Sequence, residues 1–294
     1  TEGMSNDDMI FAIFGYVKSN IKWDGYYGYS CNDGVKAAYK NQTGNIAEIN
    51  LMLTAMLRYV GLNANPVLVS TRSNGIAYFP NRTAYNYVIA AVETTNGLVL
   101  LDATDKYALP NILPVRDLNW FGRLIRKDGT SMEVDLMPKG MSREINYVIA
   151  VIKPDGSAEG KIRKQYTDYK ASEYRAKSVG ANTESFIESI ENENSGIEIS
   201  GYTRENDLDL YKPLTESYGF KDTKTSENIN GKLYVSPLMF LTFTENPFKQ
   251  EKREYPIDYG YPTEVKYTIS IELPQGYTVE SIPKPINLVT GDGI

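Results

Sequence analysis

Apolar residues recur at spacings of three and four along residues 46–60, which predicts one amphipathic helix. Gly61 follows this stretch, and glycine can end a helix in the left-handed conformation without a Cβ clash. The apolar run at residues 66–69 then predicts a short buried strand. The residues that would share one face of the helix are Ile46, Ile49, Leu53, Met56, Leu57 and Val60.

A second helix is predicted near the start of the chain. Ser5 and Asp8 have the spacing of a capping box, in which each residue's side chain accepts a hydrogen bond from the other's backbone N–H. The helix should run to about Asn20. An aromatic loop at residues 26–29 and a short helix at residues 35–39 follow it.

Two strands are predicted at residues 85–93 and 98–102, joined through Asn96-Gly97, a strong hairpin signal. Pairing across so short a turn should bring Tyr87 close to Asp102. Helices packed on an antiparallel sheet make this first half an α+β domain, which we place at residues 1–140.

From residue 141 to residue 294 the pattern of the sequence changes to one of predicted strands joined by turns. A Pro-Asp-Gly turn at residues 154–156 predicts a hairpin of residues 145–153 and 157–166. We predict a β-rich, sandwich-like domain with short helices, and we expect it to be incomplete because residues 291–294 form no evident final element. The further segments are helices at 171–177 and 184–191 and strands at 197–203, 208–216, 232–235 and 265–273.

Composition excludes several kinds of chemistry. The 294 residues contain no histidine, so no imidazole can serve as a general base or a metal ligand. The net charge of -6 and pI near 5.0 disfavour nucleic-acid binding. No apolar run approaches the roughly 20 residues that span a bilayer. The 23 tyrosines are explained first by half-exposed β-strands, in which tyrosine is common, and only second by a ligand-binding site.

Neither the single cysteine nor the acidic residues of the second half predict a site. Cys31 lies 13 residues before Gly44 and has no histidine to activate it, so we expect an ordinary, partly buried thiol. The spacing of Asp207, Asp209, Asp258 and Glu264 matches no calcium loop, so we expect solvated strand faces, no metal site and no cofactor.

The stretch around the central helix resembles the transglutaminase-like, papain-related superfamily. Its pattern is a glycine, an acid or Asn, a cysteine, any residue, an acid and then an apolar helix, and here Gly44, Asn45 and Glu48 fit. The resemblance implies that Ile46 stands at the cysteine position, Tyr87 at the histidine position and Asp102 at that of the orienting acid. It also implies a groove beside which Asn45, Tyr26, Tyr27 and Tyr29 would lie, although the tyrosines could equally form a local lid.

The resemblance is most specific over residues 40–125 and points to a bacterial envelope-associated branch in which a β-rich domain follows. It therefore implies a periplasmic, cell-surface or secreted protein, although the opening Thr-Glu-Gly is not a signal peptide. With isoleucine and tyrosine at two of three catalytic positions, we expect no enzyme but a pseudoenzyme with a binding or structural role. Its partners would be a peptide, a glycan or an envelope protein.

Two alternatives stay open from the sequence. The first is a hydrolase that uses paired carboxylates on a glycan, because the chain has 37 acidic residues. The second is a purely architectural module without a ligand.

Overall fold

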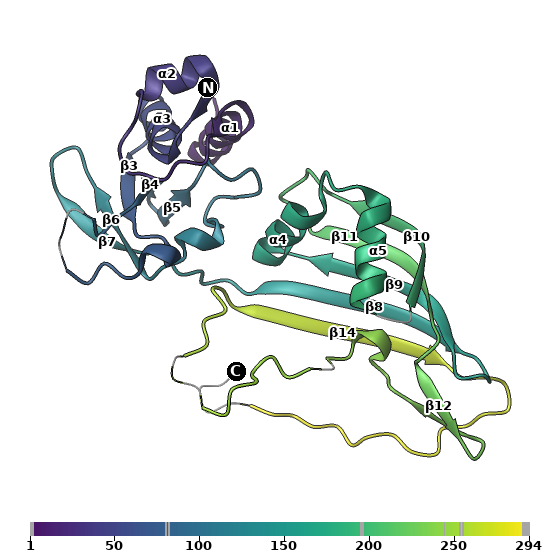
Figure 1. Ribbon diagram of the computed structural model, residues 1–294. Coiled ribbons are helices and arrows are strands. Elements are labelled where there is room, and N and C mark those ends of the chain that lie inside the picture. The colour runs from purple at the N-terminus through teal and green to yellow at the C-terminus, as the bar shows by residue number, and fades with distance from the viewer. Residues whose placement is uncertain are drawn as a thin grey trace.

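The computed structural model describes residues 3–79, 81, 83–194, 197–243, 245–252, 254 and 256–289. Residues 291–294, where we expected no final element, lie outside this set. The chain forms two five-stranded sheets, each with helices on one face (Figure 1). The predicted α+β class and the predicted β-rich second half are both confirmed.

The first sheet is antiparallel throughout and has the strand order β5-β4-β3-β6-β7. The hairpin of its last two strands was not predicted from the sequence. The strands are β3 (Ala64–Val69), β4 (Tyr87–Thr94), β5 (Gly97–Leu101), β6 (Phe121–Ile125) and β7 (Ser131–Asp135).

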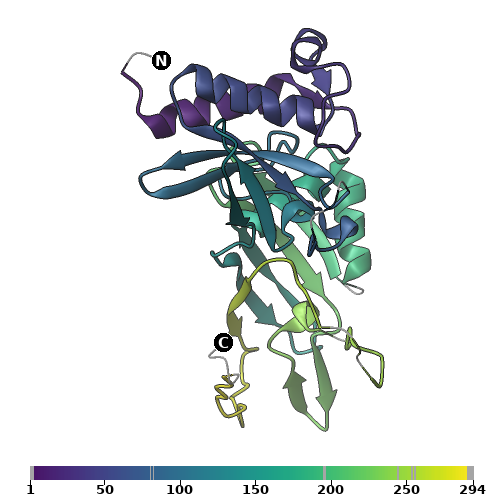
Figure 2. The same cartoon turned by 90° about the vertical axis from the view of Figure 1, so that its left-hand side faces the viewer.

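Helices α1 (Asn6–Asn20), α2 (Val35–Asn41) and α3 (Ile46–Tyr59) gather on one side of this sheet (Figure 2). The predicted capping box of Ser5 and Asp8 is present at the start of α1. Gly61 has φ +88°, as expected of a residue that ends α3 in the left-handed region. Two short strands, β1 (Lys22–Trp23) and β2 (Thr43–Gly44), pair in parallel beside the helices.

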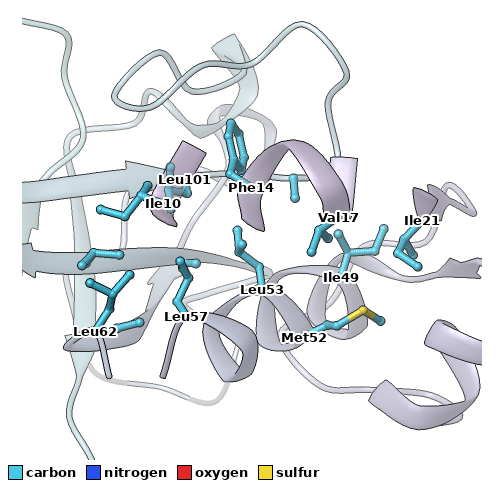
Figure 3. Packing of buried hydrophobic residues seen from close by; sticks show 14 of the residues in the cluster. Ile10, Phe14, Val17, Ile21, Ile49, Met52, Leu53, Leu57, Leu62 and Leu101 are labelled. Carbon is cyan, nitrogen blue, oxygen red and sulfur yellow. The ribbon is translucent and has the colours of Figure 1, made fainter. Parts of the chain in front are cut away.

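Helix α3 is the centre of this domain, and it is buried on two sides. Ile49, Leu53 and Leu57 are fully buried against α1 and β5 (Figure 3). Ile46 instead packs in a second cluster together with Tyr87. The apolar face predicted for α3 therefore contributes to two clusters along its length, because its first turn faces β4.

The second sheet has the order β10-β11-β9-β8-β14, in which only β14 and β8 pair in parallel. The strand of this sheet that comes first along the chain, β8, begins at Ser142, close to the predicted boundary at residue 141. The strands are β8 (Ser142–Ile152), β9 (Ala158–Tyr166), β10 (Ile197–Glu205), β11 (Leu214–Asp222) and β14 (Thr263–Glu272).

One face of the second sheet is covered. Helices α4 (Asp168–Ser178) and α5 (Thr183–Glu193) lie on it, and so does the small hairpin of β12 (Ser226–Ile229) and β13 (Lys232–Val235). Among the described residues, no other sheet of comparable size packs against this face of the second sheet. The expectation of a sandwich is therefore corrected to one sheet with a helical layer.

The predicted strand at residues 208–216 is also wrong. Residues 206–213 form a loop, and the strand begins only at Leu214. Arg175, a buried residue of α4, holds the loop because its Nη2 donates to the carbonyl oxygens of Asn206, Asp209 and Lys212 at 2.9–3.0 Å. A contact this distant in sequence cannot be predicted from local propensity.

The segment before β14 connects the two halves. The ring of Tyr261 stacks on that of Tyr169 at 4.7 Å, and both belong to the apolar cluster of the first domain that contains Tyr87. Arg72 pairs with Asp258 at 2.8 Å and also donates to the carbonyl oxygen of Leu118. No described helix is long and apolar enough to cross a membrane.

Candidate functional site

The start of α3 is held by a capping box. The Asn45 side chain accepts from the backbone N–H of Glu48, and the Glu48 carboxylate accepts from the N–H of Asn45, each at 2.9 Å. Gly44 is required here, since a Cβ would lie 2.9 Å from the Cβ of Ala38. Asn45 is 1% exposed, so its side chain lines no open groove.

Ile46 lies in the first turn of α3, at the position that the family resemblance assigns to a nucleophile. Its side chain is fully buried and packs in the same apolar cluster as Tyr87 of β4. A saturated hydrocarbon side chain has no lone pair with which to attack a carbonyl carbon.

Tyr87 and Asp102 form a buried hydrogen bond, in which the Tyr87 hydroxyl donates to Asp102 Oδ2 at 2.7 Å. Asp102 follows the last residue of β5, and its Oδ1 accepts from the Asn50 amide and from the backbone N–H of Thr104, both at 2.9 Å. The carboxylate is thus saturated with donors, as a buried charge must be.

Arg116 completes the arrangement from the other side. Its Nε donates to the Tyr87 hydroxyl at 3.0 Å, and its Nη2 donates to Thr104 Oγ1 at 2.8 Å and lies 3.5 Å from Asp102 Oδ2. The guanidinium also stacks over the Trp23 ring at 4.9 Å. We call Tyr87, Asp102, Thr104 and Arg116 the polar cluster.

The protonation states in the polar cluster follow from burial and charge. Burial opposes ionisation of Asp102, but the Arg116 charge and its hydrogen bonds outweigh this and hold its pKa below the ordinary value. Burial, together with the Asp102 charge, raises the pKa of Tyr87 well above its usual range, so its phenol stays protonated. The same two causes raise the pKa of the neighbouring Asp117 well above normal.

Asp117 is fully buried, and neither of its oxygens has a hydrogen-bond donor among the described residues. Two carboxylates at close range cannot both stay ionised in a buried site. A proton retained on Asp117 would give it a donor toward Asp102, which fits the opposite directions of their pKa shifts.

The aromatic loop lies over the polar cluster. The Tyr27 ring contacts the rings of both Trp23 and Tyr87, with centroids at 5.5 and 5.8 Å. The loop is held by Trp23 Nε1, which donates to the carbonyl oxygen of Tyr26 at 3.1 Å. Tyr26, Tyr27 and Tyr29 are 67%, 49% and 44% exposed. Tyr27 therefore covers the polar cluster with one edge and faces solvent with the other.

Asn50, Thr104, Arg116 and Asp117 were not predicted from the sequence as members of this site. Asn50 had a usable signal: it lies four residues after Ile46, hence on the same side of the helix, and is polar within an apolar pattern. Arg116 and Asp117 belong to the one-turn helix η2 (Val115–Asp117), which no local pattern connects with Tyr87.

Two sizeable cavities beside this domain lie away from the polar cluster. They have volumes of about 630 and 690 Å³ and flank the loop at residues 109–112, between the two sheets. Neither is lined by Ile46, Tyr87 or Asp102. Ile46, Tyr87 and Asp102 are themselves fully buried.

The acidic residues that we considered as metal ligands are each paired with a cation. Asp207 contacts Arg204 at 2.6 Å and Asp209 contacts Lys212 at 2.9 Å. Asp258 pairs with Arg72, and Glu264 pairs with Arg143. Within the described ranges, no three His, Cys, Asp or Glu side chains gather in a way that could hold a metal ion.

Cys31 is partly buried beside the start of α3. Burial, and secondly the Glu48 charge, raise the pKa of its thiol. We therefore expect Cys31 to react with iodoacetamide at pH 7 more slowly than free cysteine does, and faster as the pH rises. Mass spectrometry of timed alkylation would measure this, and a reaction at pH 6 as fast as that at pH 8 would contradict it.

Comparison with known families agrees with this geometry. Residues 1–103 match the family model of the transglutaminase-like superfamily, and residues 231–294 match that of a domain of unknown function, DUF3858. A search among curated proteins returned no match.

The first turn of α3 faces the antiparallel sheet, with Tyr87 on β4 and Asp102 directly after β5. Over residues 1–103 the chain is thus similar to the transglutaminase-like superfamily. Among solved structures, a protein of Parabacteroides distasonis that is described as a candidate protease is similar at 13% identity and a TM-score of 0.40. The alignment covers 76% of this chain and 47% of that protein.

Proposed function

We propose that the transglutaminase-like domain is non-catalytic and has a binding or structural role. The observation that carries this proposal is the hydrogen bond of 2.7 Å between the buried Tyr87 hydroxyl and Asp102, at the positions where the family would have a histidine and its orienting acid. A protonated phenol that donates to a carboxylate cannot accept a proton from a nucleophile. Ile46 offers no nucleophile to activate.

The binding surface is the exposed side of the tyrosine loop rather than an open cleft. The rings of Tyr26 and Tyr27 present flat apolar faces with a polar hydroxyl, which suits extended peptides and sugar rings. Arg116 is 23% exposed at its side chain and lies next to these rings, so it adds a donor for a carbonyl or hydroxyl oxygen. A location in the bacterial envelope is part of this proposal.

No observation favours the alternative function, a hydrolase that uses paired carboxylates on a glycan. Asp102 and Asp117 are neighbouring acids in this domain, and both are completely buried. A glycosidase needs its two carboxyl groups on either side of an accessible sugar bond.

The test has a catalytic arm. The full chain is incubated with glutamine-containing and cell-wall peptides, and amide hydrolysis and amine incorporation are followed by mass spectrometry. We expect no turnover above the buffer rate. Turnover that is lost in Tyr87→Phe, with the melting temperature of the variant checked, would overturn the proposal.

A binding arm separates the binding role from the structural one. Peptide and glycan arrays are probed with the wild type, with Tyr26→Ala/Tyr27→Ala and with Tyr59→Ala, a 92% exposed tyrosine at the end of α3 that serves as the matched control. Loss of one stacked ring can weaken binding by about tenfold. Weakening only in the double variant supports the tyrosine loop as a binding surface. If nothing binds, the structural role remains.

A further inference from the structure

One face of the second sheet is left uncovered. Helices α4 and α5 and the β12–β13 hairpin all lie on the opposite face, so this one meets solvent (Figure 1). Tyr147, Ile149 and Val151 of β8 form an apolar stripe on it and are 43%, 67% and 41% exposed. A contiguous exposed apolar stripe of this kind marks an interaction surface more often than an isolated apolar residue does.

Two cations lie next to this stripe. In the strand register, Arg163 of β9 pairs with Tyr147, and Lys161 pairs with Ile149. Both side chains are exposed, and neither forms an ion pair with an Asp or Glu of the described residues, whereas other charges of this sheet do, such as Arg143 with Glu264. Two unpaired cations are notable in a chain with a net charge of -6.

The neighbouring strands on this face carry small residues. Ser217 and Gly219 of β11 pair with Arg163 and Lys161, and Ser200 of β10 pairs with Gly219. A Cβ at Gly219 would lie 2.7 Å from Ser200 Oγ, so a larger residue would clash here. With glycine at this position, no side chain rises above the sheet. The long side chains of β8 and β9 therefore stand beside a shallow floor, and the groove between them has a volume of about 700 Å³.

We propose that this groove binds an acidic protein segment that also carries apolar side chains. Carboxylates of the partner would pair with Lys161 and Arg163, and its apolar side chains would cover Tyr147 and Ile149. Exposed aliphatic residues favour a protein over an anionic glycan, because a sugar chain offers little apolar surface to cover Ile149. The opposite charges would steer association and make it depend on salt. This site is independent of the tyrosine loop and lies in the other domain.

The test selects random twelve-residue peptides by phage display on the immobilised full chain. Selected peptides are then titrated by fluorescence anisotropy against the wild type, Lys161→Glu/Arg163→Glu, and Ile149→Ser. The matched control is Lys36→Glu/Lys40→Glu, which makes the same change of charge on exposed positions of α2 in the other domain. Circular dichroism melts establish that each variant is folded.

We expect the selected peptides to be rich in Asp and Glu together with apolar residues. Binding should weaken by at least about tenfold in the charge reversal and about fivefold in Ile149→Ser, but less than about twofold in the control. No enrichment of acidic peptides, or equal binding by the reversed variant, would overturn the proposal. So would binding of polygalacturonate in the groove without binding of any acidic peptide.

Discussion

Replacing Arg116 with alanine is expected to lower the free energy of unfolding by about 3 to 5 kcal/mol at pH 7, because it leaves a buried charge without its counterion. Asp102 is fully buried and keeps its charge through Arg116 and several hydrogen bonds. Removing Arg116 also takes a donor from the Tyr87 hydroxyl and from Thr104. Urea unfolding followed by circular dichroism would measure the loss.

The pH dependence of this variant tests the electrostatic origin of the loss. Arg116 helps hold the folded-state pKa of Asp102 below the unfolded value, so Asp102 contributes stability above the unfolded pKa that is lost as the pH falls through the folded one. Without Arg116, burial raises the pKa of Asp102 in the variant, so its carboxyl takes up a proton as the pH falls and the difference from wild type shrinks toward pH 4. Arg123→Ala, which removes an exposed arginine of β6, is the control and should change stability by less than about 0.5 kcal/mol. Equal losses in the two variants would show that Arg116 has no special role.

Replacing Glu216 with glutamine is expected to stabilise the protein by about 2 to 3 kcal/mol at pH 8, because it removes an ionised group from a buried site. Glu216 lies on the covered face of the second sheet and is 1% exposed. Burial raises its pKa to about 7, and the nearby Glu144 adds to the shift. Lys164, whose Nζ lies 3.9 Å away, only partly offsets it.

The sign follows from the direction of the shift. The folded-state pKa of Glu216 is raised, so the wild type loses stability as the pH rises from the unfolded pKa, about 4.3, to the folded value of about 7. The benefit of the substitution should be present at pH 8 and nearly absent at pH 5. The neutral glutamine can still accept the hydrogen bond that the Tyr202 hydroxyl donates at 3.0 Å.

Denaturant unfolding of Glu216→Gln at pH 5 and pH 8 measures this effect. Glu272→Gln, a change at an exposed position of β14, is the matched control and should be neutral at both values. An effect of Glu216→Gln that is the same at pH 5 and pH 8 would contradict a buried, titrating carboxyl.

Much of the first domain could be read from local patterns. The periodicity of residues 46–60, the capping residues Ser5 and Asn45, and Gly61 each act within a few residues of themselves, so the helices were placed from sequence alone. The hairpin at Asn96-Gly97 has the same local origin, and it brought Tyr87 and Asp102 together. The absence of histidine, also a property of the sequence, excluded imidazole chemistry.

Other features depend on contacts between distant segments, and only the tertiary structure decided them. Arg116 donates to Tyr87, 29 residues away, and Arg175 holds a loop more than 30 residues away. Neither contact can be predicted from a local periodicity in the sequence. The second half was expected to be sandwich-like, but α4, α5 and β12–β13 cover the apolar face of its large sheet instead. The packing of α4, α5 and β12–β13 decides which face of the second sheet is covered. The opposite face, with Ile149 and Arg163, is exposed for this reason, and the sequences of the strands alone do not determine it.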